Sequence, residues 1–311
     1  MTPNRSYYRV MAGGKSVHAA ECYQQGYIGL WGLEEDLTGK LPDNWRDFNK
    51  AFIPVYLAAN PDKSRVAAGL ACGMLHTLCK GINQGDVILC PTGTGQYYVG
   101  EVVSDYYHVP GSALPHRRRV HWYDKGFGRD ELSEEMKRST AAAGSVINIS
   151  RFADHIEALL GGRQLPVLSH SDPSVEDPSV FALEKHLEDF LVANWPTTEL
   201  GRDYDIFTVD GEIVGQQYPS DTGPIDILAI SKDQKTLLVV ELKRGRASDA
   251  VVGQIQRYMG YAKEELAEPG QQVRGIIIAL EDDLRLRRAL SVAQGIEFYR
   301  YRVNFTLVKA G

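Results

Sequence analysis

The sequence predicts an α/β (α+β) chain that folds as two domains. A length of 311 residues exceeds that of a typical single domain. Short β-like runs alternate with helical patterns on both sides of residues 161–180, and that stretch is rich in Gly, Pro, Ser and Asp without apolar periodicity. It therefore indicates a linker between a domain over residues 1–160 and a domain over residues 181–311.

The first domain is expected to contain early helices followed by a strand-rich half. The helical patterns cover residues 16–25, 45–59 and 64–80, and the last of these is capped by Ser64 and closed by Gly81. Strand-like runs cover residues 7–11, 27–32, 85–90, 96–103, 118–123 and 146–150. This order favours a small curved sheet or open β-barrel with inserted helices.

The second domain shows the order of a mixed sheet flanked by helices. Helices are predicted over residues 181–194, 249–265 and 283–293, the first of them stopped by Pro196. Strands are predicted over residues 203–209, 224–230, 236–243, 274–280, 296–303 and 305–309. Helices between the strands allow parallel pairing, so we expect both strand directions in one sheet.

Composition excludes several classes of protein. The net charge of −6 does not suit a protein that coats nucleic acid through bulk charge, so a DNA partner would be met by local basic patches. No apolar run approaches the length of a membrane span and no N-terminal targeting pattern is present, so we expect a cytoplasmic protein without a membrane partner. The cysteines form no CxxC pair, which predicts buried reduced thiols.

Charged side chains stand at the end of an apolar strand in the second domain. In the run TLLVVELK, side chains alternate between the two faces, so Glu241 and Lys243 share a face with Val239. A charge on a buried strand is costly unless it is paired or coordinates a metal ion. The two residues therefore need a partner.

Asp226 is the expected partner. It lies in the preceding strand, GPIDILA, and a hairpin would bring it beside Glu241. Two adjacent carboxylates repel each other unless a divalent cation neutralises them, and Mg²⁺ prefers oxygen ligands of this kind. On the same face, Lys243 can orient the attacking water or stabilise the charge of a pentavalent phosphate.

These residues resemble the signature of the PD-(D/E)xK nucleases, with Pro224-Ile225-Asp226 near its first half and Glu241-Leu242-Lys243 as its second. The sequence over residues 181–280 is similar to the NucS-like branch of that superfamily. It departs from that branch at Gln216-Gln217-Tyr218, where relatives commonly carry a basic residue before the tyrosine. The resemblance implies a restriction-endonuclease-like fold and a metal-dependent deoxyribonuclease that uses Mg²⁺, with Mn²⁺ as a substitute. It implies metal ligation by Asp226 and Glu241, and a catalytic set completed by Lys243, the helix-borne Glu188, and the Gln254–Tyr258 pair, which shares one helical face.

The sequence over residues 7–150 resembles the PUA-like (EVE-like) modules of Mrr-like restriction nucleases. That resemblance implies recognition of a modified or flipped base between aromatic side chains, for which the candidates are Trp31, Tyr97, Tyr98 and Trp122. The alternative for each ring is a place in the core. Candidate phosphate contacts, with a solvated loop as the alternative, are Arg117, Arg118, Arg119, Arg244 and Arg246.

The sequence is thus interpreted as a DNA endonuclease with a type IV-like, modification-dependent restriction role in phage defence. One alternative is a NucS-like repair endonuclease that acts on mismatched or branched DNA. The other is a nucleic-acid-binding regulator without catalysis. Cutting both strands with one site per chain would favour a homodimer.

Overall fold

A computed structural model describes residues 5–141, 144–161, 187–209 and 211–301. By its internal contacts the chain divides into two compact units, Met1–Ser169 and His170–Gly311. Almost all of the predicted linker over residues 161–180 lies outside the described residues.

The first unit is built on a curled sheet of eight strands. Its order is β2-β6-β4-β3-β1-β8, with β5 added to β6 and β7 added to β4. The strands are β1 (Tyr7–Val10), β2 (Tyr27–Leu30), β3 (Val87–Pro91), β4 (Gln96–Val102), β5 (Tyr107–His108), β6 (His116–Trp122), β7 (Phe127–Gly128) and β8 (Val146–Asn148). Only β1 and β3 pair in parallel among these described strands. The expected α+β class and curved sheet are confirmed.

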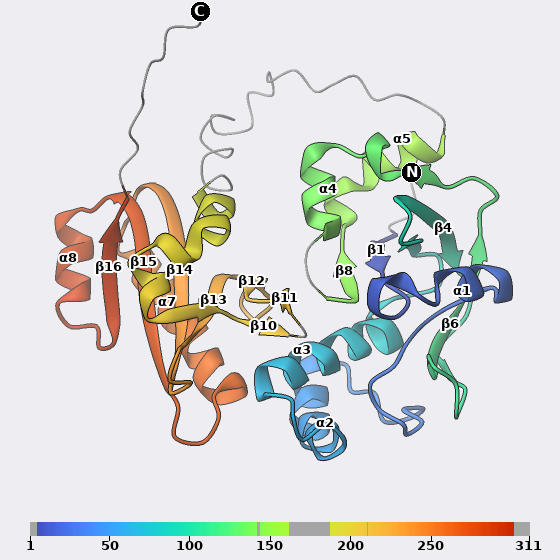
Figure 1. The fold of residues 1–311 in the computed structure, drawn as a ribbon, viewed down its shortest axis with the longest axis horizontal. Helices are drawn as coiled ribbons and strands as arrows, with labels where there is room; N and C mark the ends of the chain where they lie inside the picture. The colour runs from blue at the N-terminus through green and yellow to red at the C-terminus, as the bar shows by residue number, and fades with distance from the viewer. Residues whose placement is uncertain (1–4, 142–143, 162–186, 210, 302–311) are drawn as a thin grey trace, which may run out of the picture. The chain divides into compact units, whose positions relative to one another are not determined.

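Helices are inserted between the strands as expected. They are α1 (Ala19–Gln25), α2 (Trp45–Ala59), α3 (Arg65–His76), its π-helical extension η2 (Thr77–Gly81), α4 (Glu134–Ala141) and α5 (Ala153–Leu160). α2 and α3 lie side by side (Figure 1), and Ser64 caps α3 by accepting a hydrogen bond from the backbone N–H of Ala67 at 3.2 Å. The expected helix over 16–25 begins late, because Lys15 and Ser16 adopt positive φ angles.

Apolar residues fill both faces of this sheet. One core, around Phe48 and Ile88, packs α2 and α3 against the sheet, and a second, around Val99 and Met136, packs α4 and α5. All the cysteines are free and buried in the first core or beside it. The prediction of buried reduced thiols is confirmed, and burial raises the pKa of Cys22 to about 11.

The second unit carries a mixed sheet in the order β12-β13-β14-β15-β16, with β9 also paired to β13. The strands are β9 (Tyr204–Ile206), β12 (Gln216–Tyr218), β13 (Ile225–Ser231), β14 (Thr236–Arg246), β15 (Gln272–Glu281) and β16 (Ile296–Arg300), and β10 (Thr208–Val209) pairs with β11 (Glu212–Ile213) apart from them. β13 and β14 are antiparallel, whereas β14, β15 and β16 run parallel. The predicted mixed sheet is confirmed, and the strand expected over 305–309 lies outside the described residues.

Helices pack on this sheet as predicted. Leu238, Val240 and Leu242 point toward Trp195, which follows the helical residues 187–194. The other helices are α7 (Ala250–Tyr261), its π-helical extension η7 (Ala262–Leu266) and α8 (Leu284–Leu290). α7 packs so closely on the opposite face that a Cβ on Gly275 would lie 2.6 Å from the sulfur of Met259. Within the described residues, no helix is long and apolar enough to cross a membrane.

Candidate active site

The candidate acids lie opposite each other on neighbouring strands. In the antiparallel pairing of β13 and β14, Ile227 faces Val240, and one step further along the same register Asp226 faces Glu241. Directly opposed residues of an antiparallel pair project from the same face. The backbone N–H of Leu242 also donates to Oδ2 of Asp226 at 2.8 Å, which holds the aspartate against β14. The structure therefore brings the two residues together as the hairpin predicted.

Glu241 and Lys243 form a partly buried ion pair. Glu241 is only 2% exposed, and the Nζ of Lys243 donates to its Oε1 at 2.7 Å. The lysine side chain is 33% exposed, so it links a buried carboxylate to the surface. An opposite charge at this distance offsets part of the cost of burying Glu241. Glu241 and Lys243, which the strand pattern predicted to share a face, are therefore in direct contact.

Glu188 reaches the same place from the helical residues 187–194. The Nε2 of Gln217 donates to Oε2 of Glu188 at 2.6 Å and to Oδ1 of Asp226 at 3.1 Å. The Nε2 of Gln216 donates to Oε1 of Glu188 at 2.8 Å. The predicted helix-borne glutamate therefore joins the strand-borne aspartate through an amide. Sequence reasoning marked the two glutamines only as a departure from the family pattern, not as contacts in the site.

The environment of Glu188 favours its neutral form. Burial raises the pKa of this carboxyl to about 7, and the charges of Asp226 and Asp189 act in the same direction, against the hydrogen bonds from the two glutamines. A carboxyl of this kind exchanges a proton near neutral pH. Asp226, by contrast, receives a backbone hydrogen bond from Leu242.

The Gln254–Tyr258 pair lies on α7. The Nε2 of Gln254 donates to the hydroxyl of Tyr258 at 3.2 Å, as the four-residue spacing allows. Tyr258 is buried, and its hydroxyl lies where a Cβ on Gly223 would come within 3.0 Å. Gly223 has a φ of +126°, so the turn that leads into β13 closes tightly over the tyrosine. The pair thus supports the turn immediately before Asp226.

The donor set suits a hard divalent cation. Asp226 and Glu241 offer carboxylate oxygens from one face, and Mg²⁺ in proteins is commonly held by one or two carboxylates together with waters and substrate phosphates. No cluster of three or more His, Cys, Asp or Glu side chains arranged to hold a metal ion occurs in the part of the chain that the structure describes.

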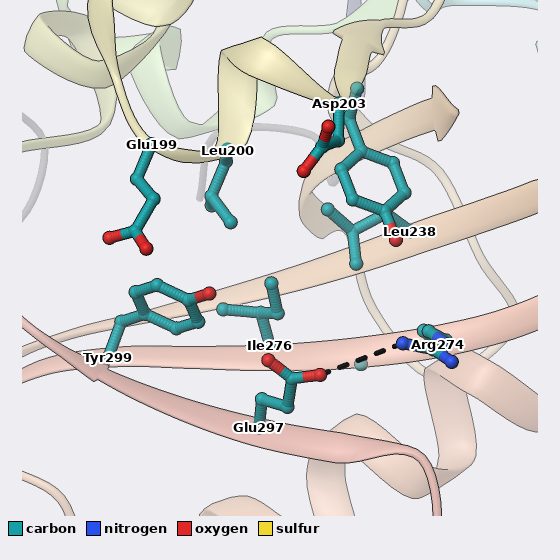
Figure 2. A pocket seen from close by; sticks show the side chains of 10 residues that line it. Glu199, Leu200, Asp203, Leu238, Arg274, Ile276, Glu297 and Tyr299 are labelled. Carbon is teal, nitrogen blue, oxygen red and sulfur yellow. Dashed lines mark ion pairs between the residues drawn. The ribbon is translucent and has the colours of Figure 1, made fainter. Parts of the chain in front are cut away.

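A separate cavity of about 170 Å³ lies elsewhere on the sheet (Figure 2). Its lining includes Leu238 and Ile276, whose side chains belong to the apolar core on the face opposite Glu241. Arg274 and Glu297 form an ion pair of 3.7 Å at its edge. Asp226, Glu241 and Lys243 do not line it. The candidate catalytic residues thus belong to a different part of the sheet.

The basic cluster of the first unit differs from the expectation. Arg118 is buried and donates to the carbonyl oxygens of Leu78 and Cys79, while the guanidinium of Arg117 lies 3.8 Å from the ring centroid of Tyr27. The prediction that both arginines contact phosphate is therefore wrong, because their guanidinium groups satisfy internal partners. Arg119 alone of the three is exposed. The side chains of Arg244 and Arg246 lie outside what the structure describes.

The predicted aromatic walls do not form one pocket. Tyr97 is buried in the core beneath α4, and Trp31, which is 53% exposed, lies near Tyr56 instead. Tyr98 and Trp122 do lie together, with ring centroids 6.3 Å apart. Tyr97 and Tyr98 cannot line the same pocket, because consecutive residues of β4 point to opposite faces of the sheet.

Tyr23 completes a half-buried aromatic cluster that sequence reasoning missed. Its ring stacks on Tyr98 at 4.2 Å and lies 6.1 Å from Trp122. Trp122 is fixed by a hydrogen bond from its Nε1 to the carbonyl of Cys22 at 3.0 Å. Tyr23 belongs to α1, and no short-range pattern in the sequence relates it to strands so far along the chain.

Together, the opposed acids, the adjacent lysine and the helix-flanked mixed sheet are the arrangement that the sequence predicted for a nuclease domain of the restriction-endonuclease type. Residues 197–303 match the family described as the endonuclease NucS C-terminal domain, so the second unit is similar to that domain over this range. Residues 8–150 match a family described as a domain of unknown function (DUF8426).

Individual relatives cover only parts of the chain. Endonuclease NucS of Methanocaldococcus jannaschii is 35% identical over 78 residues, which cover 25% of this chain and 28% of that protein. An EndoMS complex with double-stranded DNA aligns at 15% identity with a TM-score of 0.33, covering 71% of this chain and 66% of the other. A repair endonuclease from Pyrococcus abyssi aligns at 16% identity with a TM-score of 0.31, covering 68% and 66%.

Proposed function

We propose that this protein is a metal-dependent DNA endonuclease whose second unit hydrolyses phosphodiester bonds. The observation that carries the proposal is the placement of Asp226 opposite Glu241, with Lys243 in contact with that buried glutamate, inside a NucS-like domain. A buried carboxylate that faces a second acid is costly for folding alone. A catalytic role gives the arrangement its reason.

The chemistry follows from the position of each group. Asp226 and Glu241 would hold Mg²⁺, or Mn²⁺ in its place. Such an ion, when bound, lowers the pKa of a water molecule and polarises the phosphoryl oxygens. The ammonium of Lys243 stands beside the acids, where it can orient the attacking water and offset negative charge that develops on the phosphate. Glu188, with a pKa raised to about 7, can take up or release a proton near neutrality.

The first unit is proposed to read a modified base. Tyr23, Tyr98 and Trp122 form a half-buried cluster of rings, and stacking of one base on such a surface contributes ~1–3 kcal/mol. Trp31 supplies a further, more exposed ring outside this cluster. Arg119 supplies an exposed cation that can contact phosphate. A separate reading unit joined to a cutting unit suits modification-dependent restriction of foreign DNA.

Repair of mismatched or branched DNA is a second candidate function. It is favoured by the match of residues 197–303 to the NucS C-terminal domain and by the identity to the M. jannaschii endonuclease. A regulator that binds DNA without cutting it is disfavoured, because such a protein has no need of a buried acid opposite a second one. In either enzymatic role, cleavage of both strands by one site per chain would call for two copies.

A cleavage screen separates these functions. The full chain is incubated with Mg²⁺ or Mn²⁺ and with three sets of duplexes: phage DNA with modified cytosine or adenine, the same sequences unmodified, and unmodified duplexes with a mismatch or branch. Cutting confined to modified DNA supports restriction, whereas cutting confined to mismatched or branched DNA supports repair. Absence of cutting on every substrate would favour the regulator.

A further inference from the structure

Gln217 has a strained backbone at the edge of the candidate site. Its φ is +50°, in the left-handed region that residues other than glycine, asparagine and aspartate seldom occupy. The residue is exposed, so the strain does not result from burying its side chain in the core. Strain of this kind persists where the surrounding structure imposes it and gathers at functional sites. The contacts of the side chain show what this conformation achieves.

The amide of Gln217 bridges two carboxylates from different elements. Its Nε2 donates to Oε2 of Glu188 at 2.6 Å and to Oδ1 of Asp226 at 3.1 Å. An amide nitrogen carries two N–H groups, and this geometry gives one to each acid. The bridge therefore connects the helical residues 187–194 to the strand that presents Asp226 opposite Glu241.

Gln216 provides an internal comparison. Its Nε2 also donates to Glu188, at 2.8 Å, but its second contact is Oδ1 of Asp189 at 3.2 Å. Both glutamines therefore hold the same glutamate, whereas the bridge to Asp226 comes from Gln217. Substitution of one or the other separates the bridge from the general support of Glu188.

The neutral charge of the bridge matters for a cation. Glu188 and Asp226 repel each other when both are ionised, and an N–H donor between them reduces that repulsion. A lysine or arginine, which the NucS-like relatives commonly carry before this tyrosine, would bring a positive charge to the acids, whereas glutamine brings none. An amide organises the acids while it leaves their negative charge available.

We propose that Gln217 is a positioning residue that fixes Asp226 and Glu188 in the arrangement that receives the divalent ion. This inference rests on the proposed nuclease function. Partners that orient metal-binding groups commonly contribute 10–100-fold to metal affinity or activity, so a loss of about that size is expected when the amide is removed.

The test measures Mn²⁺ binding by calorimetry on the full chain without DNA, together with thermal melting in EDTA. Gln217→Gly removes the amide and also relieves the strained φ, so it should raise the melting temperature or leave it unchanged while weakening Mn²⁺ binding about 10–100-fold. Gln217→Asn tolerates the same backbone and keeps a shorter amide, and it should retain more affinity than Gln217→Gly. Gln234→Gly is the matched control, because exposed Gln234, in the turn between β13 and β14, also has a positive φ of +62°; it should bind Mn²⁺ within about twofold of the wild type. Gln216→Ala removes one amide donor to Glu188 but keeps the bridge to Asp226, so it should lose less affinity than Gln217→Gly.

The outcomes separate this inference from the function on which it rests. If Gln217→Gly binds Mn²⁺ as tightly as the wild type, the positioning role is overturned. If Asp226→Asn loses affinity for Mn²⁺ in the same series, Asp226 still stands as a metal ligand. Tighter binding by Gln217→Gly would also overturn it, because the amide would then act as a competitor. A wild-type chain that binds no Mn²⁺, or binds it equally in Asp226→Asn, overturns the metal site itself and the inference with it.

Discussion

The backbone N–H of Leu242 donates to the Oδ2 of Asp226 at 2.8 Å, so this carboxylate is attached to the strand that carries Glu241. The contact gives Asp226 a structural as well as a proposed catalytic role. Its two roles can be separated, because asparagine can keep the accepting oxygen while it removes the charge.

We expect Asp226→Asn to abolish cleavage and weaken divalent-ion binding without loss of folding. Removing one of two facing charges relieves repulsion with Glu241, so the melting temperature in EDTA should hold or rise. Asp226→Ala should lose activity equally but melt lower than Asp226→Asn, since the Leu242 N–H then lacks its acceptor. Equal melting temperatures for the two variants would show that this hydrogen bond contributes nothing.

Lys243→Met is expected to cut at least ~10²-fold more slowly while DNA affinity is retained, because the ammonium acts on the transition state. Single-turnover cleavage and fluorescence anisotropy measure the two effects. The control is Lys235→Met, an exposed lysine just before β14, which should cut at the wild-type rate. If DNA affinity falls as far as the rate, the lysine is merely a phosphate contact.

Glu188 predicts a pH dependence of stability. Its folded pKa, raised to about 7, lies above the ordinary value, so its contribution to stability is complete below the unfolded pKa and is lost as pH rises toward 7. We expect Glu188→Gln to melt higher than the wild type at pH 8 and to show no such gain at pH 4, in EDTA. The same substitution at exposed Glu212 serves as the control for the change in charge. A gain that is equal at both pH values would contradict the assigned environment.

The two neighbouring arginines of β6 should behave differently. Arg118→Met is expected to lower the melting temperature, because buried carbonyl oxygens of Leu78 and Cys79 lose their donor. Arg119→Ala should leave the melting temperature unchanged. It should reduce the slope of log DNA affinity against log salt concentration by about one, as expected for the loss of one phosphate contact. Binding isotherms at several salt concentrations measure this slope. If the slope changes in a fully folded Arg118→Met variant but not in Arg119→Ala, then Arg118 and not Arg119 contacts phosphate.

Local patterns predicted much of the fold and the centre of the site. Strand alternation placed Glu241 and Lys243 on one face, and the short connection between two apolar runs placed Asp226 opposite Glu241. The position of Ser64 before an apolar helix predicted its cap. These features depend on residues close together in sequence, or on one hairpin.

Features set by distant contacts were not predictable in this way. Arg117 and Arg118 appear as a surface cluster in the sequence, yet Arg117 stacks on Tyr27 of β2 and Arg118 donates to carbonyl groups within η2. The bridge made by Gln217 depends on a positive φ that no propensity favours for glutamine. Tyr23 joins Tyr98 only once α1 has packed on the sheet.

The most direct test of the central claim compares wild-type and Asp226→Asn full-length chains, purified side by side, in cleavage of a mixture of modified, unmodified and mismatched duplexes with Mn²⁺. We expect that the wild type cuts at least one class of duplex, that EDTA stops the reaction, and that Asp226→Asn does not cut while remaining folded. Equal cleavage by the two proteins, or cleavage that persists in EDTA, would contradict it.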